Sequence, residues 1–241
     1  MINFGHETEE PEFNKRIRKI IAKAGFGERA EITVFRREED GSDYSVWKIA
    51  EDGVTRVLKK TSKREKDIYD AFLVSAECGA PGLYKSIEYD GELFLLMEYI
   101  EGHNLQKCDR KSLTAAMDAL IYLQNMYWEK RQLQGIGHGF EASLTGRQKR
   151  GKYLNDTELE QAYERFLQIY QEIPRTLCHD DLLPFNVICT KERAVLIDWE
   201  YAGILPYPTS LARLIAHGEE DESAFFFMTQ KDKDYAIDYY Y

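Results

Sequence analysis

Hydrophobic and polar residues alternate in two different ways along the chain, and the change falls near residue 98. Up to that point, short segments alternate with a period of two, which is the pattern of half-buried strands. These segments are Glu31–Arg36, Tyr44–Ile49, Val54–Lys60, Leu83–Tyr89 and Glu92–Glu98. Asp-Gly pairs at 40–41, 52–53 and 90–91 separate neighbouring segments and predict hairpin turns.

Apolar residues at helical spacing predict the helices. Phe13–Ala24 precedes the strands, and Ser62–Ala76 lies between the third and the fourth. Beyond residue 98 the helical pattern prevails, in Ser112–Glu129, Asp156–Glu172, Ser210–His217 and much of Glu219–Tyr241. We therefore expect an α+β, bilobal fold. Residues 1–98 would form an antiparallel sheet lobe with one main helix, and residues 99–241 a mostly helical lobe.

Composition narrows the class of protein. The 241 residues are 44% hydrophobic and 13% aromatic, which is typical of a folded globular chain. A formal net charge of −10 argues against a nucleic-acid partner and permits a cationic substrate. The apolar runs are too short to cross a bilayer and residues 1–11 are polar, so neither a membrane partner nor a signal peptide is expected. The four cysteines contain no CxxC pair, which favours reduced thiols in a cytoplasmic protein.

The richest chemistry lies between residues 178 and 200. His179-Asp180-Asp181 is followed, five residues after the second aspartate, by Asn186, and a hydrophobic strand then ends at Asp198. The segments Val187–Thr190 and Ala194–Ile197 predict two paired short strands, which would bring Asn186 and Asp198 close together. A base, an amide and a second carboxylate in this order are what phosphoryl transfer requires.

The residue types suggest a role for each position. Asp181 would orient an acceptor hydroxyl and take its proton. Asn186 and Asp198 would offer a neutral and an anionic oxygen to Mg²⁺, which prefers hard oxygen ligands. His179 is expected to brace the loop rather than to take part in the chemistry. The alternative is a surface turn rich in aspartate beside an unrelated Asp198, and the combination of motif and strands disfavours it.

Candidate phosphate-binding residues lie on the third strand and the helix after it. Lys59 ends a Val57-Leu58-Lys59 stretch that matches the Val-Ala-Ile-Lys pattern of kinase strands. We assign Lys59 to the nucleotide phosphates, and Glu65 on the following helix to an ion pair with Lys59. A solvated strand lysine is the alternative for Lys59, and one of many surface charges is the alternative for Glu65.

The remaining nucleotide contacts are expected from a turn and a hinge. The turn between the first two strands lacks a Gly-x-Gly-x-x-Gly run, but Ser42 and Ser45 could donate to a phosphate. A plain hairpin turn is the alternative there. The backbone of Glu98 to Ile100, where the last strand leads out of the first lobe, is expected to bind an adenine edge.

These motifs resemble those of the aminoglycoside phosphotransferase and choline kinase family, small-molecule kinases with a protein-kinase-like fold. The resemblance covers residues 30–217 and rests on His179–Asn186 and Leu196–Gly203, with support from Val57–Lys59 and Arg64-Glu65. It implies ATP, Mg²⁺ and transfer of a phosphoryl group to a hydroxyl of a small, cationic molecule, either a choline-like amino alcohol or an aminoglycoside. It also implies Asp181 as base and Asn186 and Asp198 as metal ligands.

Three features depart from the family pattern. Asp180 stands where the family has the glycine of His-Gly-Asp, and Ser210 stands where an aspartate often precedes Leu-Ala. The chain ends at Tyr241, so the helical lobe is expected to be reduced or truncated. These departures keep open a second hypothesis, a nucleotide-binding pseudokinase or interaction module with little turnover. The absence of Asp-Phe-Gly and Ala-Pro-Glu signatures argues against a protein kinase.

Three further segments are assigned no function. Gly135–Gly139 resembles a glycine-rich phosphate loop, but it follows a helix, so a flexible loop between helices is expected. The basic run at residues 147–152 predicts a solvated loop. Phe225–Phe227 predicts packing within a helix, with an exposed interface as the alternative.

Overall fold

The computed structural model describes residues 12–36, 41, 43–74 and 79–241. The chain divides into two units, each made from two stretches of sequence. The first unit holds the residues up to Thr61 together with Leu83–Tyr99, and the second holds Ser62–Gly82 together with Ile100–Tyr241. The helix that follows the third strand therefore belongs to the second unit, although the strands that flank it in sequence belong to the first.

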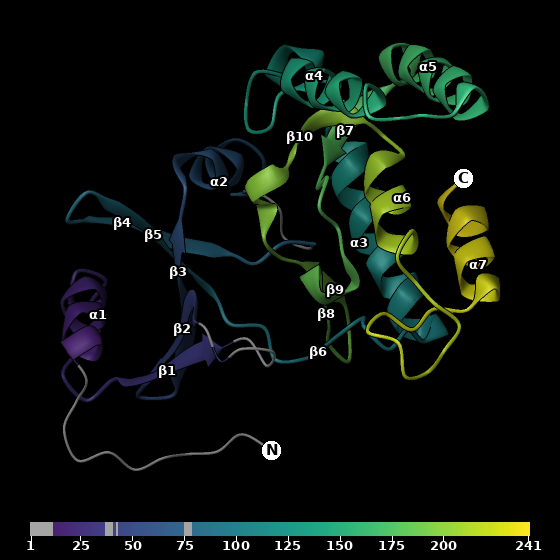
Figure 1. Cartoon of the computed structure of the whole chain (residues 1–241). Helices are drawn as coiled ribbons and strands as arrows, with labels where there is room; N and C mark the ends of the chain where they lie inside the picture. The colour runs from purple at the N-terminus through teal and green to yellow at the C-terminus, as the bar shows by residue number, and fades with distance from the viewer. Residues whose placement is uncertain (1–11, 37–40, 42, 75–78) are drawn as a thin grey trace. The chain divides into compact units, whose positions relative to one another are not determined.

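The first unit is a five-stranded antiparallel sheet with one helix, α1 (Glu12–Ala22) (Figure 1). The spatial order of the strands is β1-β2-β3-β5-β4. They are β1 (Glu31–Arg36), β2 (Asp43–Glu51), β3 (Val54–Thr61), β4 (Leu83–Tyr89) and β5 (Glu92–Glu98). The bounds predicted for β1, β4 and β5 are confirmed, and β2 and β3 are slightly longer than predicted.

The core of the first unit lies between α1 and one face of the sheet. Ile17, Ile20 and Ile21 recur along one side of α1 and are buried. They form a single cluster with apolar residues of β2, β3, β4 and β5, among them Leu58. Because side chains alternate along a strand, the burial of Leu58 in this core places Lys59 on the opposite face of the sheet, where it is half-buried.

The second unit is mostly helical. Its helices are α2 (Lys63–Ile68), which continues as a π-helix over Tyr69–Leu73, α3 (Arg110–Met126), α4 (Phe140–Gly151), α5 (Thr157–Glu172), α6 (Thr209–Ile215) and α7 (Gln230–Tyr240). Its short strands are β6 (His103–Asn104), β7 (Arg175–Cys178), β8 (Val187–Cys189), β9 (Ala194–Leu196) and β10 (Gly203–Pro206). They form a three-stranded sheet, β6-β8-β9, and a separate antiparallel pair, β7 with β10.

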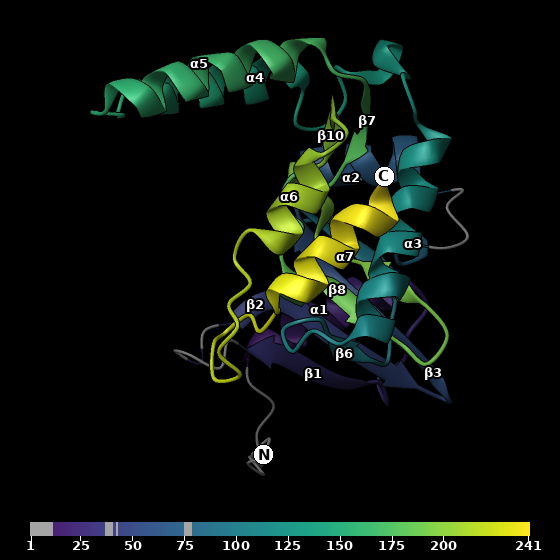
Figure 2. The same ribbon diagram turned by 90° about the vertical axis from the view of Figure 1, so that its right-hand side faces the viewer.

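The helix α3 is the central support of the second unit. Apolar residues at helical spacing along it are buried, among them Leu113, Leu120 and Leu123. It packs against β9 and against α7, while α4 packs against α5 (Figures 1 and 2). The strands that carry the predicted chemistry therefore rest on the longest helix of the unit. No helix of the described residues is both long and apolar enough to span a membrane.

Two expectations for this unit are wrong. Most of the basic run at 147–152 lies in α4, a helix that buries few apolar residues, chiefly Phe140 and Leu144, and so shows little hydrophobic periodicity. Phe225–Phe227 lies outside any helix, because α7 begins only after the N-cap Thr229. The backbone of Phe227 instead forms bridges with Lys107 and Glu219.

Candidate functional site

The loop between β7 and β8 carries the predicted base, Asp181. The backbone oxygen of Asp181 accepts a hydrogen bond from the Leu183 N–H at 2.8 Å and a second from Nδ2 of Asn186 at 2.9 Å. Pro184 opens a 3-10 helix over Pro184–Asn186, at a position where the missing N–H of proline costs no hydrogen bond. The side chain of Asn186 thus bonds across the loop to the backbone of Asp181.

Asn186 and Asp198 lie at the ends of two paired strands. β8 and β9 are antiparallel, with Val187 opposite Leu196, so the predicted pairing is confirmed. One step beyond the strands, the N–H of Ile197 donates to the backbone oxygen of Asn186 at 2.9 Å. Asp198 follows at once, in a left-handed conformation with a φ of 67°. The structure therefore brings together the backbones of Asp181, Asn186 and Asp198.

The donor set suits a hard divalent cation. Because Nδ2 of Asn186 is bonded to the Asp181 carbonyl, the amide presents Oδ1 as its acceptor end. Asp198 adds a carboxylate, and oxygen ligands of both kinds are those that Mg²⁺ takes from proteins beside the phosphates of a nucleotide. No group of three or more His, Cys, Asp or Glu residues with the potential to hold a metal occurs in the part of the chain that the structure describes.

Glu65 is buried beside Asp198 within the second unit. Its Oε1 accepts the backbone N–H of Trp199 at 3.2 Å, and only 2% of the residue is exposed. Burial, together with the charges of Glu65 and Asp198, raises the pKa of the Tyr69 phenol well above its ordinary value. Glu65 therefore fastens α2 to the segment that follows Asp198. Its predicted pairing with Lys59 joins the two units and stays a prediction.

The other predicted nucleotide contacts are spread over both units. In the first unit, Lys59 lies on β3 opposite Val46 of β2 and Leu95 of β5. Ser45 is half-buried near the start of β2 and has a φ of 57°. Glu98 is the last residue of β5, and Ile100 begins the second stretch of the second unit. Ser42 lies outside the described residues.

His179 and Ser210 support the loop between β7 and β8 from the protein interior. His179 is fully buried, its Nε2 lies 2.7 Å from the Ile197 oxygen, and its ring centroid lies 4.7 Å from that of Trp199. Its backbone N–H donates to Oγ of Ser210 on α6 at 2.9 Å. The serine that departs from the family pattern thus still supplies the loop with a hydrogen-bond acceptor.

Asp180 occupies a backbone conformation that suits glycine. Its φ is 54°, in the left-handed region that favours glycine. Its carboxylate lies 3.1 Å from Nη2 of Arg147 on α4. Burial raises the pKa of Asp180, and the charge of Arg147 opposes that shift. Arg147, which belongs to the basic run on α4, therefore forms an ion pair with Asp180, the residue next to the predicted base Asp181.

Sequence reasoning misses Arg213, which contacts the predicted base. Its Nη2 lies 2.8 Å from Oδ1 of Asp181. The available signal is spacing, since Arg213 follows Ser210 by three residues on a predicted helix and so shares its face. Nothing in the sequence indicates that this face meets the loop.

The glycine-rich segment 135–139 is bonded to the chain beyond Asp198. The N–H of His138 donates to the Ala202 oxygen at 2.8 Å, and Gly137 forms a bridge with Gly203. A Cβ at Gly137, whose φ is +73°, would lie 2.4 Å from the Ala202 oxygen. Gly137 and Gly203 allow the two backbones to come into contact, which accounts for the glycine at position 137 without a phosphate.

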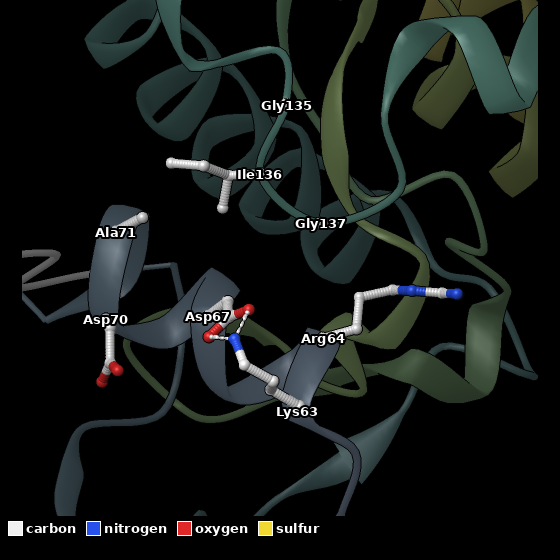
Figure 3. Close-up of a pocket in the computed structure, with 8 residues that line it drawn as sticks. All are labelled: Lys63, Arg64, Asp67, Asp70, Ala71, Gly135, Ile136 and Gly137. Atoms are coloured by element: carbon white, nitrogen blue, oxygen red, sulfur yellow. Dashed lines mark hydrogen bonds and ion pairs between the residues drawn. The ribbon is translucent and has the colours of Figure 1, made fainter.

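The same segment and α2 line an open cavity of about 530 Å³. Figure 3 shows Lys63 and Asp67 turned toward each other there, and their ion pair measures 2.6 Å. Asp181, Asn186 and Asp198 do not line it. We therefore treat this cavity as separate from the candidate site.

Comparisons with known proteins identify the family. Residues 24–238 match the model of the phosphotransferase enzyme family, and the chain belongs to that family. It is similar to Protein LicA of Haemophilus influenzae, with 23% identity over 143 residues, which is 56% of this chain and 54% of LicA. The chain thus spans about half the length of the curated relatives that it matches.

Solved structures share the fold. An aminoglycoside-3'-phosphotransferase of type VIII has a TM-score of 0.65 at 16% identity, over 96% of this chain and 92% of that one. A choline/ethanolamine kinase family protein of Mesorhizobium loti has a TM-score of 0.60 at 16% identity, over 95% and 75%. The predicted α+β, kinase-like fold and the family resemblance are confirmed. Other related structures hold ADP with streptomycin, or AMP-PNP with Ca²⁺.

Proposed function

We propose that the protein transfers the γ-phosphoryl group of ATP to a hydroxyl of a small molecule. Membership of the phosphotransferase enzyme family supports this proposal. The observation that carries it is the position of Asn186, whose side chain bonds to Asp181 and whose backbone bonds to the residue before Asp198. The residues proposed as base and as oxygen ligands thereby come from one loop and one strand end, an arrangement that supports phosphoryl transfer.

In the proposed reaction, Asp181 accepts a hydrogen bond from the acceptor hydroxyl and takes its proton as the oxygen bonds to the γ-phosphorus. The bond between that phosphorus and the bridging oxygen breaks, and ADP leaves with the electron pair. Asp181 later returns the proton to solvent. When bound by Asn186 and Asp198, Mg²⁺ would neutralise charge on the phosphate oxygens.

The proposed donor is a nucleotide, which the ADP and AMP-PNP complexes of related proteins support. Lys59, paired with Glu65, would contact the phosphates, because a strand lysine is the cation that kinase-like folds use there. The hydroxyls of Ser42 and Ser45 and the backbone from Glu98 to Ile100 are proposed for the remaining contacts with phosphate and adenine.

The proposed acceptor is an amino alcohol of the choline type or an aminoglycoside. A related structure from Streptomyces rimosus binds streptomycin, and the Mesorhizobium loti relative is of the choline/ethanolamine kinase family. Phe185, four residues after Asp181, is 38% exposed, and its ring centroid lies 5.8 Å from that of Phe226, which packs on the exposed Phe225. Aromatic faces attract an ammonium group by roughly 0.5–1 kcal/mol at exposed sites.

The test is phosphoryl transfer from ATP to a panel of amino alcohols and aminoglycosides, with the wild type, Asp181→Asn and Asp238→Asn. Asp238 is exposed on α7 and serves as the control. We expect kcat to fall by about 10²- to 10⁴-fold in Asp181→Asn and to stay unchanged in the control. Binding of AMP-PNP should persist in all three. Nucleotide binding without transfer to any acceptor would instead favour a pseudokinase or interaction module.

A further inference from the structure

The guanidinium of Arg213 lies against the carboxylate of the proposed base. Its Nε and Nη2 are 3.1 and 2.8 Å from the same oxygen, Oδ1 of Asp181. The two side chains are 37% and 28% exposed, so the contact lies at the edge of the protein interior. The other oxygen, Oδ2, accepts no hydrogen bond from a residue that the structure describes, which leaves it available to an incoming hydroxyl.

One face of α6 contacts the loop between β7 and β8 at two points, the backbone of His179 and the side chain of Asp181. Ser210 receives the backbone N–H of His179, and Arg213, three residues later, binds the side chain of Asp181. The helix itself is fixed by buried residues on its inner side. His217 accepts a hydrogen bond from the remaining Arg213 nitrogen, Nη1, at 2.7 Å, so the guanidinium is held from two sides. Arg213 therefore has a second partner besides the Asp181 carboxylate.

We propose that Arg213 is a positioning residue, which orients the Asp181 carboxylate so that one oxygen faces the acceptor hydroxyl. This inference rests on the proposed function. Two charge-assisted hydrogen bonds to Oδ1 restrict rotation of the carboxylate, which is otherwise partly exposed to solvent. A general base has to lie within hydrogen-bonding reach of the proton that it takes, and a displacement of about 1 Å can reduce a rate by about 100-fold.

The test compares two variants of Arg213 with a matched control. Arg213→Met removes every donor and keeps much of the apolar length, while Arg213→Lys keeps the charge with a different geometry. Arg131→Met is the control, because Nε and Nη2 of Arg131 also contact a carboxylate, that of Glu129, at 2.9 and 3.4 Å. The measurements are kcat and KM for transfer from ATP to an acceptor of the wild type, the Kd of AMP-PNP, and the melting temperature.

We expect kcat to fall by about 100-fold in Arg213→Met and to fall less in Arg213→Lys. In the control Arg131→Met, kcat should stay unchanged. The Kd of AMP-PNP and the melting temperature should stay at the wild-type values. An unchanged kcat in Arg213→Met would overturn the inference. So would parallel losses of kcat, nucleotide affinity and melting temperature in both Arg213 variants, since these indicate a structural role. A wild type that binds AMP-PNP and transfers to no acceptor would refute the proposed function, and the role of Arg213 with it.

Discussion

Substitutions of Asp180 separate the strain of its backbone from the effect of its charge. Asp180→Gly and Asp180→Ala both remove the carboxylate and its 3.1 Å ion pair with Arg147. They differ at the backbone, because at a φ of 54° alanine carries a steric cost of about 1–2 kcal/mol that glycine does not. Glycine loses about 0.5–1 kcal/mol more than alanine in chain entropy on folding. The net prediction is that Asp180→Gly is the more stable variant by about 0.7 kcal/mol, near the middle of a range of about 0–1.5 kcal/mol.

Urea unfolding followed by tryptophan fluorescence measures this difference. The matched control is the same pair of substitutions at Asp234, an exposed residue within α7. There the order should reverse, since alanine is favoured over glycine by about 1 kcal/mol within a helix. If alanine were at least as stable as glycine at both positions, the strain assigned to Asp180 would be refuted.

A third variant, Asp180→Asn, isolates the charge and predicts a pH dependence. Burial raises the pKa of Asp180 above its ordinary value of 3.8, although Arg147 opposes the shift. The folded protein therefore binds this proton more readily than the unfolded chain. Stability from Asp180 is fully present below pH 3.8 and is lost as the pH rises through the raised pKa. Asparagine should thus become more favourable relative to the wild type between pH 4 and pH 7, and a change in the opposite direction would contradict the reasoning.

Two further predictions concern buried hydrogen bonds and close backbone contacts. Ser210→Ala leaves the buried N–H of His179 without its acceptor and should lower the free energy of unfolding by about 1–3 kcal/mol, whereas the exposed Ser223→Ala should change it by less than about 0.5 kcal/mol. Gly137→Ala places a Cβ against the backbone oxygen of Ala202 and should lower the free energy of unfolding by more than about 2 kcal/mol. Gly135→Ala is its control, because a Cβ there meets nothing within 4 Å. Thermal and urea unfolding measure the stability of each variant and of its control. Equal losses in Ser210→Ala and Ser223→Ala would contradict the role of the hydrogen bond to His179, and equal losses in Gly137→Ala and Gly135→Ala would contradict the close contact at Gly137.

The sheet of the first unit was predictable because its turns are encoded locally. Asp52 and Asp90 have φ values of 48° and 51°, and the glycine after each is also positive. Two successive residues with positive φ define the type I′ turn, which matches the twist of a hairpin and fixes its register. Strand alternation then supplied the bounds of β1, β4 and β5.

The contacts around the base were not predictable, because they depend on how separate helices meet the loop. The loop motif indicated Asp181 and Asn186, but Arg213, which contacts Asp181, comes from α6, and Arg147, which contacts the neighbouring Asp180, comes from α4. A sequence pattern gives the face of a helix and not the element that the face meets. Glu65 shows the same limit, since no sequence pattern indicates that its carboxylate also accepts the backbone N–H of Trp199, far away in sequence.

The segment Ser62–Gly82 gives the second unit a discontinuous sequence. Within that unit Glu65 receives the N–H of Trp199, and the Gly79 oxygen receives the N–H of Leu196 at 2.9 Å. A fragment that starts at Ile100 would lack these partners, and its own interior would be incomplete. A hybrid made by recombination with a relative therefore has to take Ser62–Gly82 and Ile100–Tyr241 from the same parent. A single crossover near residue 100 would instead combine the two stretches of the second unit from different parents in one core.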